Sequence, residues 1–241
     1  MTVADLTSYR AEWSDPVELE FRGHALRTRS GLSDVPAAVG RLPELRGLEE
    51  PERALALVGA LSDDLPPRDG TTNVSAIDAD GNACVLTTSL GLGSGDFVPG
   101  LDLHLNSMLG EADLFTDGLG PGDRMASMMA PTLALDADGV TLAAGAAGGT
   151  RLRSALLEVV AGILDEGLGP QAAVDRPRIH PAGTLVHLEP GYGPATVAAL
   201  ESAGFEVRVW NSKHHFFGGV SVVTRGSAAA DPRRSGAARI V

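Results

Sequence analysis

Residues 70–83 have the sequence GTTNVSAIDADGNA, and the pattern in and after this stretch decides the predicted fold. Residues 72–77 and 83–89 are rich in residue types that favour β-strands. The intervening Asp78-Ala79-Asp80-Gly81-Asn82 has the composition of a tight turn. The sequence therefore predicts a β-hairpin that starts next to Thr71.

The same turn motif occurs a second time. Asp136-Ala137-Asp138-Gly139 separates two further strand-like segments, residues 131–135 and 140–144. An EF-hand calcium loop would need more oxygen ligands and a glutamate at its twelfth position. Neither copy supplies them, so the sequence predicts two hairpins and no calcium site at either turn.

Helical patterns alternate with strands along the rest of the chain. The clearest helix is predicted for residues 150–166, where apolar residues recur at helical spacing and Gly167 is the expected C-cap. Residues 49–61 and 194–203 also have helical patterns. Further strands are predicted at residues 17–22, 184–189, 205–210 and 220–224. Strands and helices in this order indicate an α+β layered domain.

Two segments lack periodic patterns. Residues 63–70 form a charged, proline-rich stretch that we expect to be an exposed connector. Residues 91–123 are rich in glycine and are predicted to form a loop.

Composition excludes several classes of partner. The chain has 241 residues, a formal net charge of −12 and a pI near 4.8, so its surface repels nucleic acids and anionic membranes. No stretch approaches the ~18 apolar residues of a membrane-spanning helix, and no secretory signal pattern is seen at the start. If Met1 is the true start, the expected location is cytoplasmic. Cys84 is the one cysteine, which excludes an intrachain disulfide.

Thr71 has a local setting in which a threonine can become a nucleophile. A threonine that is the first residue of a chain uses its own α-amine as the base, and such an amine titrates near ~7.7–8.0. A chain creates this residue by cleaving itself, which needs a small residue before the cut, and Gly70 precedes Thr71. A Gly-Thr pair before a strand is more often an ordinary strand start, so this pattern alone leaves the role of Thr71 open.

The wider sequence resembles the small catalytic subunit of the gamma-glutamyltranspeptidase family. After residues 70–83, eight motifs follow in the family's order: Gly93-Ser94-Gly95, Val98-Pro99-Gly100 and residues 105–114, 127–132, 145–151, 176–180, 217–220 and 231–234. The resemblance divides the chain into a large-subunit-like remnant with a linker, residues 1–70, and a small-subunit-like catalytic domain, residues 71–241.

This resemblance implies an N-terminal-nucleophile hydrolase. The expected fold is a four-layer αββα sandwich that is truncated on the large-subunit side. The expected activity is self-cleavage between Gly70 and Thr71, followed by formation of an acyl-enzyme on Thr71 from a γ-glutamyl or related amide, such as glutathione. We expect no cofactor and no bound metal.

The resemblance also assigns catalytic roles by position. Thr71 corresponds to the nucleophile, and Ser89 to a hydroxyl that hydrogen-bonds it. Gly148 and Gly149 correspond to the oxyanion turn. The residues themselves agree with that last role, because the two glycines precede the helix predicted from residue 150, and N–H groups at a helix N-terminus favour negative charge.

Three further residues are implied in substrate binding. Glu111 corresponds to an acid that holds the substrate's α-ammonium, and Ser127 to a serine that holds its α-carboxylate. Asn106 lies in the segment that resembles the family's asparagine and acidic motif, so it is also a candidate substrate contact.

Departures from the family pattern keep two functional hypotheses open. No residue corresponds to the family's carboxylate-binding arginine, Met128 replaces a second serine, and Asn73 stands where histidine is frequent. The chain is therefore either a γ-glutamyltransferase/hydrolase-like enzyme or a degenerate, non-catalytic homologue. A third option is a subunit that needs a separate large chain. Either another chain covers the apolar surface of the catalytic domain or the sequence is a fragment, and the expected partners are a second copy of this chain or the missing large subunit.

Two basic pairs have no assigned role. His214-His215 has no third ligand at helical or hairpin spacing, so we predict a surface or pocket-rim pair rather than a metal site. For Arg233-Arg234 the sequence leaves two interpretations open, namely an anion-binding role or solvated charges near the carboxyl end.

Overall fold

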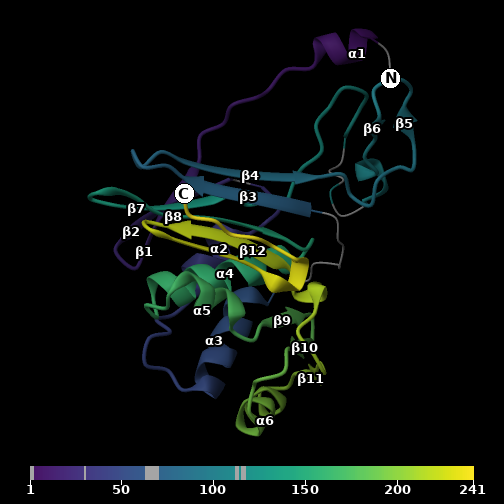
Figure 1. Cartoon of the computed structure of the whole chain (residues 1–241). Helices are drawn as coiled ribbons and strands as arrows, with labels where there is room; N and C mark the ends of the chain where they lie inside the picture. Colours follow the sequence, from purple (N-terminus) through teal and green to yellow (C-terminus); the bar gives the residue numbers. More distant parts are fainter. Residues whose placement is uncertain (1–2, 30, 63–70, 112–113, 115–117) are drawn as a thin grey trace.

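The computed structural model describes residues 3–29, 31–62, 71–111, 114 and 118–241. A six-stranded sheet lies at the centre, with helices packed on one face and a long hairpin lying across the other (Figure 1). The predicted α+β class is confirmed. The described residues supply one helical layer and two β-layers, which matches an αββα sandwich without its large-subunit side.

The central sheet combines strands from both ends of the chain. All neighbouring strands in it run antiparallel. Its strand order is β1 (Val17–Phe21), β2 (His24–Thr28), β7 (Thr132–Asp136), β8 (Gly139–Ala147), β12 (Gly219–Thr224) and β13 (Ser227–Ala230). The segment before the connector therefore shares one sheet with the segment after it.

The predicted hairpin at residues 72–89 is confirmed as β3 (Thr71–Ile77) and β4 (Ala83–Ser89). Side chains alternate between a half-buried face and an exposed face along both strands. On the half-buried face the Asn73 amide hydrogen-bonds with the hydroxyls of Thr87 and Ser221, each at 2.6 Å. The bond to Ser221, which lies on β12, attaches β3 to the central sheet, whereas the bond to Thr87 joins the two strands of the hairpin.

The hairpin lies close to β8 because β8 has a glycine at the contact. A Cβ at Gly145 would lie 2.6 Å from Asn73 Cγ, well inside van der Waals contact. On the opposite face of the hairpin Val74 and Leu86 are each 58% exposed, and none of the helices in the described ranges packs there.

Helices cover the other face of the sheet. The longest, α4 (Arg151–Leu164), is buried over its first three turns against β8 and β12. Its neighbour α3 (Glu50–Leu61) begins where the Glu49 N–H donates to the Glu52 carboxylate at 3.3 Å, half of a capping box. Two shorter helices, α2 (Val35–Arg41) and α5 (Pro170–Asp175), complete this layer.

Smaller elements surround this framework. Three of them form a separate sheet beside the helices, in the order β11, β10, β9 (Figure 1). The elements are α1 (Val3–Ser8), β5 (Phe97–Val98), β6 (Leu103–His104), β9 (Ile179–Ala182), β10 (Leu185–Leu188), α6 (Pro194–Ser202) and β11 (Glu206–Val209), with short 3-10 helices η1 (Met108–Gly110), η3 (His215–Phe217) and η4 (Pro232–Arg234).

Most predicted helices and strands are confirmed, and the elements that were not predicted are short. The second hairpin and the helices predicted at residues 49–61, 150–166 and 194–203 all occur. The prediction that residues 91–123 are only a loop is wrong, because β5 pairs with β6 and η1 follows. The sequence analysis also missed β2, α2, α5, β9 and β13. The connector at residues 63–70 lies outside the described residues.

A buried ionic network anchors the carboxyl-terminal motif. Asp231 pairs with Arg178 at 2.6 Å and with Arg233 at 3.2 Å, and Arg233 also pairs with Glu189. All four side chains are at least nine-tenths buried. Removing one partner of such a network leaves an uncompensated buried charge. The network therefore fixes η4 against the edge of the central sheet.

We predict that Gly145→Ala destabilises the protein by about 1–3 kcal/mol, because the new methyl group overlaps the Asn73 amide. Urea denaturation followed by circular dichroism measures the loss. The double variant Asn73→Ala/Gly145→Ala is the matched control, since it removes the overlapping amide. A Gly145→Ala protein no less stable than Asn73→Ala/Gly145→Ala would show that the two strands do not meet closely here.

His180 makes stability depend on pH. The ring is 7% exposed, and its Nδ1 lies 2.7 Å from Ser154 Oγ. Burial, reinforced by the positive charge of Arg151, lowers the pKa of His180 from 6.5 to about 3. The folded state holds the ring neutral, whereas the unfolded chain protonates it below pH ~6.5. This stabilisation is therefore complete above that pH and is lost as the pH falls towards 3.

We expect His180→Asn to weaken this pH dependence, because asparagine keeps a polar group near Ser154 but does not titrate. Between pH 7.5 and 4.5 the wild type should lose about 2–3 kcal/mol more unfolding free energy than the variant. Urea titrations at both pH values give the comparison, with His215→Asn, at an exposed histidine, as the control. Equal losses in wild type and His180→Asn would contradict the account.

Candidate active site

Thr71 and Ser89 face each other at the open end of the hairpin. They are cross-strand partners in the β3–β4 register, and both side chains are half-buried on the face that packs against the central sheet. Directly opposed residues have side chains about 5 Å apart. The pairing therefore places the Ser89 hydroxyl beside the predicted nucleophile, and Ser89 Oγ also accepts the Gly91 N–H at 3.1 Å.

A small cavity brings most of the predicted site residues together. It has a volume of about 30 Å³. Thr71, Ser89, Glu111, Ser127 and Gly149 line it together with apolar side chains. These five residues come from four separate parts of the sequence, so their convergence is a property of the fold.

The Gly148-Gly149 turn connects β8 to α4. Gly149 lines the small cavity, whereas Gly148 is buried behind it, where a Cβ would lie 2.7 Å from the Cα of Gly218. Among the described residues, neither glycine N–H has a hydrogen-bond partner. Unpaired N–H groups just before a helix are suited to bind an anion.

Backbone hydrogen bonds hold the segments that carry Glu111 and Ser127, the residues predicted to bind the substrate's α-ammonium and α-carboxylate groups. Glu111 follows η1 directly, and its N–H donates to the Met108 carbonyl at 2.9 Å. The Ser127 carbonyl accepts the Leu32 N–H at 3.1 Å, which ties this segment to the amino-terminal part of the chain. Both residues line the cavity that Thr71 also lines.

Asn106 lies outside this cavity. It is exposed, and its Oδ1 accepts the Met108 N–H at 3.0 Å, so its side chain stabilises the start of η1. Its predicted substrate contact stays a prediction.

The small cavity has too little free volume for a substrate in this conformation. Its volume of about 30 Å³ is close to that of one water molecule and far below that of an amino acid. Met128 and Met129 line it, and Met128 occupies the position at which the family pattern has a second serine. Substrate entry therefore requires movement of these flexible side chains or of the loop that carries them.

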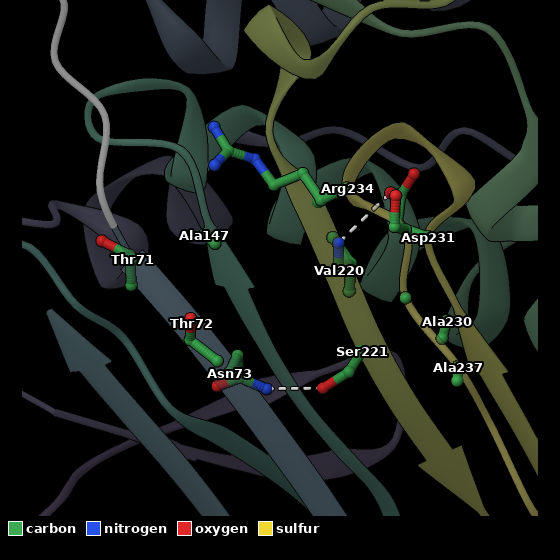
Figure 2. Close-up of a pocket in the computed structure, with 13 residues that line it drawn as sticks. Thr71, Thr72, Asn73, Ala147, Val220, Ser221, Ala230, Asp231, Arg234 and Ala237 are labelled. Carbon is green, nitrogen blue, oxygen red and sulfur yellow. Dashed lines mark hydrogen bonds between the residues drawn. The ribbon is translucent and has the colours of Figure 1, made fainter.

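Thr71 also borders a second, larger cavity, which the sequence analysis did not predict. Figure 2 shows its lining between β3, β8, β12 and the carboxyl-terminal segment. The volume is about 250 Å³, and Arg234 and Asp231 are the charged residues among the described lining. The sequence of the carboxyl-terminal motif gave no indication that this motif lies near Thr71, because that proximity depends on tertiary packing.

The structure shows the surroundings of the two basic pairs, Arg233-Arg234 and His214-His215. Arg233 is buried in the ionic network, so for this residue the interpretation as a solvated charge is wrong. The ring centroids of His214 and His215 lie 4.1 Å apart with the rings tilted, and His215 is exposed whereas His214 is half-buried. Within the described ranges, no three His, Cys, Asp or Glu side chains are grouped so that they could hold a metal.

No helix in those ranges has the length and apolar character needed to span a membrane.

Comparisons with known proteins agree with this geometry. Residues 49–241 match the family model described as Gamma-glutamyltranspeptidase. The chain is 29% identical over 182 residues to the glutathione hydrolase proenzyme of Pseudomonas sp. (strain A14), and the match covers 67% of this chain. The solved gamma-glutamyltranspeptidase of Pseudomonas nitroreducens, complexed with L-DON, superposes with a TM-score of 0.60 at 26% identity, covering 70% of this chain and 99% of that one.

A further solved structure matches nearly the whole fold. The cephalosporin acylase of Bacillus halodurans superposes with a TM-score of 0.76 over 97% of this chain and 54% of that one, and its 22% identity supports the shared fold alone. The chain spans 31% of the length of the Pseudomonas glutathione hydrolase proenzyme. Since the family model covers most of the sequence and the fold agrees with it, this chain belongs to the gamma-glutamyltranspeptidase family.

Proposed function

We propose that this chain is an autoprocessing acyl-transfer enzyme that cleaves its Gly70–Thr71 bond and then uses Thr71 to attack a γ-glutamyl or related amide. The observation that carries this proposal is the shared cavity of Thr71 and Gly149. A hydroxyl nucleophile and an unpaired N–H before a helix are the two groups that acyl transfer needs.

Self-cleavage would proceed through Thr71 itself. The Thr71 hydroxyl attacks the carbonyl carbon of residue 70, the acyl group moves from nitrogen to oxygen, and water hydrolyses the resulting ester. The product is a chain that begins at Thr71 with a free α-amine. With a pKa near ~7.7–8.0, that amine is partly unprotonated at neutral pH and can accept the hydroxyl proton in the next reaction.

Acyl transfer would then use the same hydroxyl. Thr71 Oγ forms an ester with the substrate carbonyl carbon, the amide C–N bond breaks, and the amine leaves with a proton. The N–H of Gly149, which lines the small cavity, would stabilise the oxyanion, aided by the N-terminus of α4. Water or an acceptor amine then attacks the ester and frees Thr71.

The substrate class follows from the relatives and from two side chains. The Pseudomonas relative is a glutathione hydrolase proenzyme, which supports a γ-glutamyl peptide such as glutathione. Glu111 carries the negative charge suited to an α-ammonium group, and Ser127 offers a hydroxyl to an α-carboxylate. Charge-assisted contacts of this kind would orient the γ-carbonyl towards Thr71.

The exposed hairpin face supports a partner chain. Val74 and Leu86 lie opposite each other on that face, and the chain covers less than a third of the Pseudomonas relative. An exposed apolar sheet face is typical of a protein interface. A separate chain that resembles the missing large-subunit portion would therefore cover the outer face of β3 and β4.

We expect the double variant Val74→Lys/Leu86→Lys to increase the solubility of the isolated chain and to leave its folded circular dichroism spectrum unchanged, because both side chains are exposed. Light scattering after size-exclusion chromatography gives the oligomeric state. A discrete wild-type dimer that the double variant abolishes would identify a second copy of this chain as the cover and would contradict a separate large chain.

A second candidate function is that of a non-catalytic homologue. The small volume of the cavity, about 30 Å³, and the methionines that line it favour this alternative. Such a protein would keep the family fold without self-cleavage and without acyl transfer.

Thr71→Ala should abolish self-cleavage, because no hydroxyl remains to attack the preceding carbonyl, whereas Thr71→Ser should retain it at a reduced rate. Intact-mass spectrometry after prolonged incubation detects the fragments 1–70 and 71–241. Thr88→Ala is the matched control, since it removes a hydroxyl from the exposed face of the hairpin. Wild-type protein that stays intact would favour the non-catalytic homologue.

A further inference from the structure

The larger cavity beside Thr71 contains a cationic side chain with no assigned role. Arg234 ends the 3-10 helix η4 and lines this cavity together with Thr71 and Ala147. In Figure 2 its guanidinium is directed away from Asp231 and towards the strand ends at which Thr71 and Ala147 lie. The side chain therefore faces the same space as the proposed nucleophile.

The fold holds Arg234 in this orientation. Its predecessor Arg233 is locked by Asp231 and Glu189, which fixes the backbone of η4. The aliphatic stem of Arg234 lies across β12, where a Cβ at Gly219 would come within 2.9 Å of Arg234 Cδ. At the far end, Arg234 Nη2 donates to the His215 carbonyl at 3.2 Å.

Asp231, the other charged residue among the described lining of the cavity, is paired with arginines of the buried ionic network. The Asp231 carboxylate accepts hydrogen bonds from Arg178 and from the Val220 N–H, at 2.6 and 3.2 Å, and it is also paired with Arg233. An arriving carboxylate would therefore meet the guanidinium of Arg234 rather than an unbalanced negative charge. Arginine binds carboxylates strongly because it offers several N–H donors in a planar fork.

The position of the cavity indicates which part of a substrate it receives. Thr71 lines both this cavity and the small cavity, where Glu111 and Ser127 are suited to the acyl head group. The larger cavity therefore lies on the amine side of the amide under attack. Its volume of about 250 Å³ is just below the usual range for ligand pockets, which suits an amino acid or a dipeptide.

We infer that Arg234 binds a carboxylate on the amine side of the reacting amide and selects leaving groups and acceptors that are amino acids or short peptides with a free carboxyl end. This inference rests on the proposed acyl transfer at Thr71. When the amide C–N bond breaks, the amine that leaves with a proton would be held through its carboxylate. In the reverse direction an acceptor amine would occupy the same cavity and attack the Thr71 ester.

A binding experiment tests this without requiring turnover. Thr71→Ala protein, which cannot react, is titrated by calorimetry with the dipeptide alanylglycine and with alanylglycinamide, which lacks the carboxylate. We expect the acid to bind roughly tenfold more tightly than the amide, which corresponds to one charge-assisted contact. Adding Arg234→Gln should remove this preference.

Arg225→Gln in the same background is the matched control, since it removes one positive charge from an arginine that pairs with Asp136 away from the cavity. It should leave the preference unchanged. Equal binding of acid and amide, no binding of either, or a preference that survives Arg234→Gln would overturn the inference. Absence of self-cleavage and turnover in the wild type, together with an Arg234-dependent preference, would reject only the proposed acyl transfer.

Discussion

The close approach of the β3–β4 hairpin to β8 is the contact on which the candidate site depends. Asn73 packs against Gly145 and bonds to Ser221, so β3 lies directly over the central sheet. Thr71 is two residues from Asn73 on the same face of β3, and the Gly148-Gly149 turn follows the end of β8. One packing contact therefore sets the distance between the proposed nucleophile and its oxyanion turn, as tight packing transmits small shifts directly.

The carboxyl-terminal segment completes the other side of Thr71. The buried pairs of Asp231 with Arg178 and Arg233 hold that segment against the sheet. Pairs of this kind contribute little net stability but are costly to break, so they act mainly by fixing one geometry. Thr71 thus lies between two cavities of different character, a small one near Glu111 and a larger one near Arg234.

Local patterns predicted the elements that carry most of this architecture. The Asp-Ala-Asp-Gly turns located both hairpins, and the apolar spacing of residues 150–166 located α4. Strand β9 contains Pro181, and β13 consists of one serine and three alanines, so neither has the β-branched and aromatic composition that marks a strand, and both were missed. The candidate site residues were assigned through the order of their motifs, and their roles stay predictions. The position of Arg234 beside Thr71 was not predicted, because no local sequence pattern encodes a contact between the two ends of the catalytic segment.

The most direct test of the central claim is to locate the acyl group. Protein incubated briefly with a γ-glutamyl amide is quenched in acid, digested and mapped by tandem mass spectrometry. The account predicts a γ-glutamyl ester on the peptide that begins at Thr71, and none in Thr71→Ala protein. Turnover accompanied by an adduct on Ser89 or on another residue, with Thr71 unmodified, would contradict it.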